Sequence, residues 1–116
     1  MSPELKKVPA RFYRLPNGKE PVREWLKALD SADRRIIGQD IATVEYGWPI
    51  GMPVCRPLGA GLWEVRSTLA SHRIARVLFM LTDGHLVLLH GFIKKTRVTP
   101  KNEIAIAQQR MREVKI

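Results

Sequence analysis

The sequence predicts an α+β fold, an antiparallel sheet flanked by an N-terminal helical hairpin and one C-terminal helix. Two stretches with apolar residues at helical spacing lie in the first half of the chain. Three stretches rich in Val, Ile, Leu and aromatic residues follow them, and another helical stretch ends the chain. Because 116 residues suffice for one hydrophobic core, we expect a single domain over residues 1–116 with the order β-α-α-β-β-β-α.

The chain is expected to begin with a strand and a short helix. Arg11–Leu15 carries alternating bulky residues and precedes a Pro-Asn-Gly turn at residues 16–18, so it predicts a strand. Pro21 suits the first position of a helix. The apolar residues of this helix recur at helical spacing: Val22, Trp25, Leu26 and Leu29.

A second helix follows at once and completes the predicted hairpin. Asp30 or Ser31 is expected to cap its start, and Gly47 with Pro49 ends it. Its apolar residues keep the helical period: Ile36, Ile37, Ile41 and Val44. A Gly- and Pro-rich connection, predicted to be irregular, comes next.

The predicted sheet is built mainly from the second half. Leu62–Ser67, His72–Leu81 and His85–Phe92 are expected to be strands, and the Thr-Asp-Gly sequence at 82–84 indicates a tight hairpin between the last two. Thr99, Pro100 and Glu103 then mark the start of the last helix. The residues available for its burial are Ile104, Ile106, Ala107 and Met111. We expect the helices to pack mainly on one face.

The charge of the chain is the first indication of function. Lys and Arg number 20 and Asp and Glu number 11, which gives a net charge of +9. Residues 53–116 hold 11 of the cations and 4 of the acids, so a net +7 lies in the second half. This favours a polyanionic partner such as nucleic acid, although basicity can also serve solubility alone.

Arg76 is the most informative single residue. It interrupts an otherwise apolar strand, where a charge is costly unless it faces a groove or an acid. A salt bridge to Glu64 is one interpretation, and a phosphate clamp is the other, because the guanidinium fork matches phosphate oxygens. Alternation along the strands separates Arg73 from Arg76, and Arg66 lies on the strand before them.

A basic loop follows the last predicted strand. Four cations fall within eight residues: Lys94, Lys95, Arg97 and Lys101. The sequence predicts that they converge with Arg66, Arg73 and Arg76 at one end of the sheet to form a phosphate site. Phe92 and Trp63 could stack on bases, or belong to the core. His90 is a possible acid or base, or a structural histidine.

Other classes of site lack support in the sequence. It has no Gly-rich phosphate loop, no metal-ligand spacing and no nucleophile motif, so neither a cofactor nor a metal is expected. The single cysteine, Cys55, predicts an ordinary reduced thiol. No apolar run suits a membrane span and Met1–Ala10 lacks a signal-peptide centre, so a cytoplasmic location without membrane contact is expected.

Four segments of the sequence resemble one protein family, the RelE/ParE toxin superfamily and its phage-derived HigB-like branch. The segments are Glu20–Leu26, Gly61–Arg66, Leu88–Thr96 and Thr99–Ile104. The resemblance implies a RelE-like fold and a ribosome-dependent mRNA endonuclease, an mRNA interferase that inhibits translation. It also implies a cognate antitoxin, often of the helix-turn-helix type.

The resemblance also implies roles for individual residues. Arg76 looks like the sheet arginine that stabilises the scissile phosphate, and Lys95 or Lys94 like the basic position after the last strand. Arg66 and Arg73 look like substrate-binding residues. The chain departs from the family where lysines of the second strand are replaced by Leu62 and Glu64, and where residues 100–116 contain neither Tyr nor His.

These departures leave alternatives open. His90 or Glu64 could transfer the proton, or cleavage could be weak. A phage-derived binding or regulatory module that acts through its antitoxin complex is therefore a second hypothesis. A ParE-like gyrase inhibitor is a third, because a shared fold does not determine activity.

Overall fold

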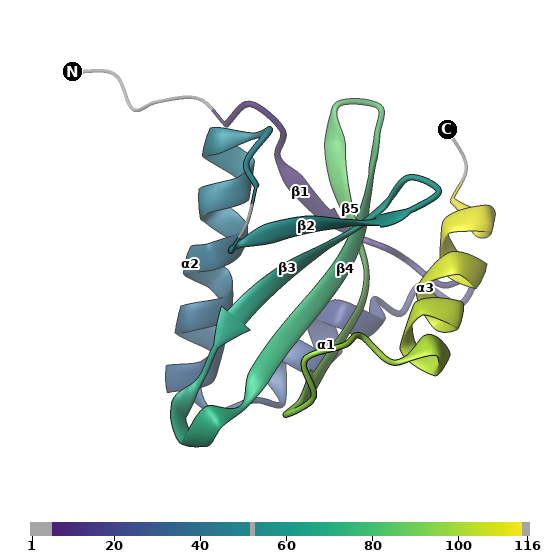
Figure 1. Cartoon of the computed structure of the whole chain (residues 1–116). Helices are drawn as coiled ribbons and strands as arrows, with labels where there is room; N and C mark the ends of the chain where they lie inside the picture. The colour runs from purple at the N-terminus through teal and green to yellow at the C-terminus, as the bar shows by residue number, and fades with distance from the viewer. Residues whose placement is uncertain (1–5, 52, 115–116) are drawn as a thin grey trace.

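The computed structural model describes residues 6–51 and 53–114, which form a five-stranded sheet with helices on both faces (Figure 1). The strands are β1 (Ala10–Phe12), β2 (Cys55–Gly59), β3 (Leu62–Thr68), β4 (Ile74–Thr82) and β5 (His85–Lys94). Their order across the sheet is β1-β5-β4-β3-β2. Every neighbouring pair is antiparallel except β1 and β5, which are parallel.

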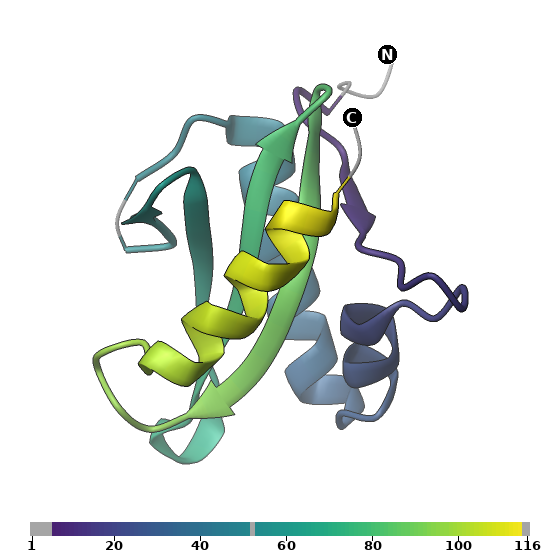
Figure 2. The same cartoon turned by 90° about the vertical axis from the view of Figure 1, so that its right-hand side faces the viewer.

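The helices are α1 (Pro21–Lys27), α2 (Ser31–Gly47) and α3 (Lys101–Glu113). Figure 2 shows α3 lying across one face of β4 and β5, with α2 behind the sheet. Helix α1 shares the core with α2 on that second face. We call the face of the sheet that α3 covers the α3 face, and the opposite face, which α1 and α2 cover, the α2 face. None of the helices in the described ranges is long and apolar enough to cross a bilayer.

The α+β class, the three helices and the β4–β5 hairpin confirm the prediction, but the order of elements differs from it. The connection expected to be irregular contains β2, so a strand was missed. β2 includes Pro57, which a strand tolerates at the edge of a sheet, where β2 lies. The expectation of a wholly antiparallel sheet was wrong for β1. Of the three α-helices in the described ranges, α1 and α2 share one face, in line with the expectation of helices mainly on one face, and α3 covers the other.

Two predicted strand boundaries also changed. β1 ends at Phe12 rather than Leu15, although the Tyr13 amide still donates to the Leu88 carbonyl at 3.0 Å. The strand expected from His72 begins at Ile74. A short 3-10 turn precedes it, and His72 within that turn has a φ of 60°, which an extended strand cannot accommodate.

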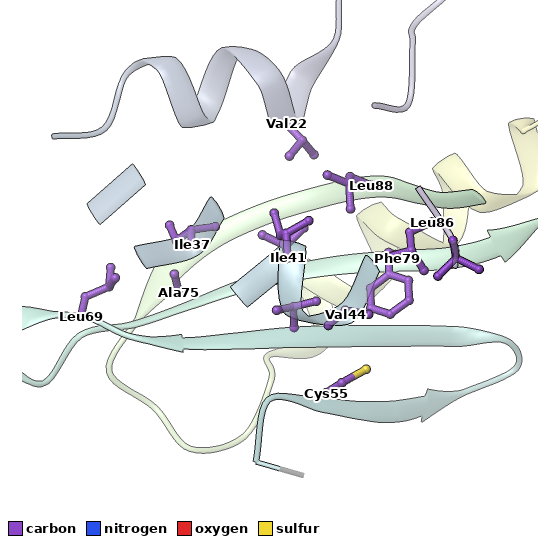
Figure 3. Close-up of a cluster of buried hydrophobic side chains, with 13 residues drawn as sticks. Val22, Ile37, Ile41, Val44, Cys55, Leu69, Ala75, Phe79, Leu86 and Leu88 are labelled. Atoms are coloured by element: carbon purple, nitrogen blue, oxygen red, sulfur yellow. The ribbon is translucent and has the colours of Figure 1, made fainter. Parts of the chain in front are cut away.

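The main core lies between the α2 face and helices α1 and α2 (Figure 3). The amphipathic spacing of the two helices brings Val22, Ile37, Ile41 and Val44 against Phe79 and other sheet residues. Cys55 is buried in the same layer, and this burial, with the charge of Glu64 as a smaller cause, raises its pKa to about 11. The thiol is therefore protonated at neutral pH. A second cluster on the α3 face includes Ala107 of α3.

Gly91 sets how closely α1 approaches the sheet. A Cβ at this position of β5 would overlap the ring of Trp25 on α1. We predict that Gly91→Ala lowers the free energy of unfolding by about 1–3 kcal/mol, because a close-packed interior resists added volume. Urea denaturation measures the change. Gly38→Ala is the matched control, since a Cβ at Gly38 of α2 meets nothing within 4 Å, and it should be neutral or slightly stabilising. Equal stability of Gly91→Ala and the wild type would contradict the packing argument.

Candidate nucleic-acid interface

The α3 face carries a row of charged side chains in the middle of the sheet. Register places Arg66 opposite Arg76 and Arg76 opposite Phe92, so the three side chains share one face. Glu64 and His90 lie in the next row of the same face. The strands therefore bring together, as expected, most of the residues singled out in β3, β4 and β5.

Arg76 is completely buried on this face. Its Nη2 donates to the carbonyls of Thr96 and Arg97, the latter at 3.0 Å, and its guanidinium lies 5.9 Å from the centre of the Phe92 ring. Burial and the nearby Arg66 lower its pKa, but an arginine stays protonated. Nε and Nη1 have no hydrogen-bond partner among the described residues. The loop after β5 thus covers Arg76, and the arginine supports the loop from below.

Glu64 is the buried counter-charge of this face. Its Oε1 accepts from Nε of Arg66 at 2.7 Å and lies 3.3 Å from Nε of Arg56. The Thr99 hydroxyl donates to Oε2 at 2.5 Å. The salt bridge to Glu64, one of the two interpretations of Arg76, is absent among the described residues, and Glu64 pairs with Arg56 and Arg66 instead. Both carboxylate oxygens of Glu64 are thus engaged in an interior where an unpaired charge would be costly.

The loop at residues 95–100 presents its cations to solvent. Arg66 Nη2 donates to the Arg97 carbonyl, so two buried or partly buried arginines hold the loop backbone. The side chains of Lys95 and Arg97 are exposed, and Val98 between them and α3 is 73% exposed. Lys101, at the start of α3, is also exposed. This basic loop is the part of the predicted site that a polyanion can reach directly.

His90 and Lys94 share the carboxylate of Glu103 on α3. His90 Nε2 lies 2.8 Å from Oε1 of Glu103, and Lys94 Nζ lies 3.3 Å from Oε2. Burial raises the pKa of Glu103, but the hydrogen bonds from His90 and Lys94 outweigh it and hold the pKa below its ordinary value of 4.5. Phe92, 7% exposed, stacks on His90 with ring centres 5.6 Å apart, so base stacking on Phe92 would need a rearrangement.

Two predicted site residues lie on the other side of the sheet. Arg73 forms a bidentate pair with Asp33 of α2, at 2.8 and 3.0 Å, and this guanidinium lowers the pKa of Asp33. Trp63 packs edge-on against Trp48, with ring centres 4.9 Å apart, at the border of the main core. Both side chains are engaged with the α2 side, because strand alternation turns them away from Arg76. The expected convergence was therefore wrong for Arg73, whereas Trp63 takes the other position considered for it, against the core.

Sequence reasoning also missed participants in this region. Arg56 was overlooked because β2 itself was not predicted. Arg110 of α3 donates to the Leu89 carbonyl at 2.7 Å. Leu89 is the extra residue where the register between β4 and β5 shifts, and a bulge leaves such a group without its ladder partner. A basic residue late in an amphipathic helix gave no sign of this contact. Among the described residues no three His, Cys, Asp or Glu side chains cluster in a way that could hold a metal ion.

Comparison with known protein families matches residues 24–112 to the family described as Phage derived protein Gp49-like (DUF891). The match covers most of the chain. The chain belongs to this Gp49-like family. It is a family of RelE-like toxins, which agrees with the resemblance noted in the sequence. A search of curated proteins found no match. The matched segment contains β2 to β5, the basic loop and nearly all of α3.

The lowered pKa of Glu103 predicts a pH dependence of stability. A carboxyl whose pKa is depressed by folding stabilises the fold above its unfolded pKa, and this contribution is lost as the pH falls from about 4.5 through the folded pKa. The free energy of unfolding of Glu103→Gln should therefore fall less than that of the wild type as the pH is lowered through this range. Urea midpoints measured at several pH values between neutral and acid test it. Glu24→Gln, at an exposed position of α1, is the control, and identical pH profiles for Glu103→Gln and the wild type would refute the effect.

Proposed function

We propose that this protein is the toxin of a toxin–antitoxin pair and that it inhibits translation by cutting mRNA on the ribosome. The observation that carries the proposal is the basic loop at residues 95–100, whose backbone is held by Arg66 and Arg76 and whose cationic side chains are exposed. Membership in a RelE-like toxin family supports the same activity. The net charge of +9 favours a polyanionic substrate.

RNA needs little chemistry from the protein, because its own 2′-hydroxyl can attack the adjacent phosphorus. The 2′-oxygen loses its proton as it bonds to phosphorus, and the bond to the 5′ oxygen breaks. That oxygen takes up a proton, so the products are a 2′,3′-cyclic phosphate and a 5′-hydroxyl. The protein has to align the chain and stabilise negative charge on the phosphate. In the proposed site Lys95 and Arg97 contact phosphates, with Lys94 beside them. His90, oriented by Glu103 at 2.8 Å, transfers a proton.

Arg76 remains the proposed stabiliser of the scissile phosphate. Because the loop covers it, it can take this role only when the loop has moved. Its Nε and Nη1 are buried without a hydrogen-bond partner among the described residues, and in the proposed complex the loop is lifted so that they bind a phosphate oxygen. With the loop in place, Arg76 positions the loop backbone. The proposed partners are the ribosome, mRNA and a cognate antitoxin of the helix-turn-helix type.

One observation favours a second candidate, a binding or regulatory module without efficient catalysis. Both acidic side chains of the site, Glu64 and Glu103, are already engaged by cations, and Arg76 is covered. A site with these groups occupied can bind a polyanion more readily than it can move protons. The two candidates differ in whether transcripts are cut.

Mapping of mRNA 5′ ends after induction in cells separates these candidates. The wild type should give cuts with codon periodicity. Lys95→Ala/Arg97→Ala should reduce them on the order of 100-fold, because transition-state charge loses its stabilisation. Arg76→Ala/Lys95→Ala should reduce them at least as strongly, but its fold must be checked because Arg76 is buried. Lys27→Ala/Arg35→Ala removes two exposed cations from α1 and α2 and should cut like the wild type.

Other outcomes point elsewhere. Growth arrest with intact transcripts and broken DNA would indicate a gyrase inhibitor. Intact transcripts without arrest would support the binding module. Equal cutting by the wild type and Lys95→Ala/Arg97→Ala would rule the basic loop out as the site.

Salt dependence tests phosphate contact independently of cutting. Binding to single-stranded RNA should weaken steeply with salt, since each neutralised phosphate releases counterions. Removing two contacts in Lys95→Ala/Arg97→Ala should reduce the slope of log affinity against log salt by roughly 1.4. Filter binding over a salt series measures the slope. A flat response of the wild type would contradict phosphate contact.

A further inference from the structure

A groove of about 800 Å³ lies at the edge of the sheet, at the end of α3 opposite to the basic loop. The 13 residues of α3 separate the two places by roughly 18 Å, at 1.5 Å per residue. Tyr13, which follows β1 directly, bonds to Glu113 at the end of α3 and so joins the two sides of the groove. The groove is lined by β1, the connection to α1, β5 and the C-terminal end of α3.

The lining of this groove combines an apolar floor with arginines. Phe12, Pro16, Val87 and Val114 supply the apolar part. Arg11 and Arg14 line it from the β1 side and Arg112 from the α3 side. All three arginines are exposed. Such a surface suits a ligand that carries both apolar groups and negative charge.

The acids of the groove leave two arginines uncompensated within the described ranges. Glu113 accepts the Tyr13 hydroxyl at 2.6 Å, and Glu20 lies 3.5 Å from Arg14. No carboxylate of residues 6–51 or 53–114 lies within 4 Å of the guanidinium of Arg11 or Arg112. The hydrogen bond to Glu113 also raises the pKa of Tyr13, so the phenol stays a neutral donor. The charge available to a ligand is therefore positive.

The backbone of β1 favours a polypeptide over a nucleic acid. The Pro9 carbonyl and the Tyr13 amide both bond to β5, so the alternation of a strand turns the Phe12 amide and carbonyl away from β5. An extended peptide can pair with such an edge while its side chains enter neighbouring pockets. Tyr13, one of the two aromatic residues in the lining, is only 5% exposed and offers little stacking surface to a base.

The groove also stands apart from the segment that defines the family. Of its ten lining residues, Val87 and Arg112 fall within residues 24–112 and the others lie outside. The groove is thus built mainly from parts that the family match does not include.

We propose that this groove binds an extended acidic segment of a partner protein. Carboxylates of the segment pair with Arg11 and Arg112, and an apolar side chain of the segment packs on Val87 and Val114. The proposal does not depend on RNA cleavage, because the basic loop contributes nothing to the groove.

Fluorescence anisotropy with the full chain tests it. The probe is a short labelled peptide in which glutamate alternates with leucine. It should bind the wild type, and Arg11→Glu/Arg112→Glu should weaken binding by roughly tenfold or more. A peptide with glutamine in place of glutamate should bind the wild type roughly tenfold more weakly. Arg23→Glu/Arg35→Glu changes the net charge equally at exposed positions of α1 and α2 and should bind like the wild type.

Amide chemical shifts locate the contact. Addition of the glutamate peptide should move the signals of Phe12, Tyr13, Val87 and Val114 and leave those of Lys95 and Arg97 in place. The proposal is overturned if the peptide does not bind, if both charge-reversed variants bind equally well, or if the signals of the basic loop move instead. It is overturned as well if an oligouridylate moves the same amide signals and displaces the peptide. If the chain cuts mRNA but fails these tests, the proposed function stands and only the proposal that the groove binds a partner is refuted.

Discussion

A positive charge buried in the sheet organises the α3 face. Arg76 lies on β4, the middle strand of the sheet, with no exposed surface, where an uncompensated guanidinium would cost several kcal/mol. Its compensation comes from backbone carbonyls of the loop at 95–100 and from the ring of Phe92. The path of the chain between β5 and α3 is thus tied to one side chain. Glu64 fixes the same segment at a second point, because its carboxylate accepts a hydrogen bond from the Thr99 hydroxyl just before α3 begins.

The arrangement divides the cations of the second half into two kinds. Glu64 pairs with Arg56 and Arg66, and the loop backbone accepts hydrogen bonds from Arg66 and Arg76. These arginines support the surface from inside. Lys95 and Arg97 have their side chains in solvent and form the surface itself. A count of charges cannot separate these kinds. The division explains how a net charge of +9 coexists with a buried, highly charged interior.

The sequence predicted most of the fold because its strongest signals are local. The period of the helical stretches and the Asp83–Gly84 turn act over a few residues, and the corresponding elements are present. β2 was missed because Pro57 argues against a strand unless the strand is known to lie at an edge. The site was predicted less well, since Arg73 meets Asp33, 40 positions away, across the sheet. The cover over Arg76 depends on the path of a loop, which no periodicity encodes.

The parallel pairing of β1 with β5 bears on how the molecule is made. Ala10 is in register with Leu86 and Phe12 with Leu88, so the first strand can take its place only after the last strand exists. Contacts so distant along the chain form late, because a long loop must close before they stabilise anything. During synthesis from the N-terminus, β1 must wait until nearly the whole sheet has left the ribosome. The groove beside β1 is therefore completed last, and a partner that binds there would recognise finished molecules only.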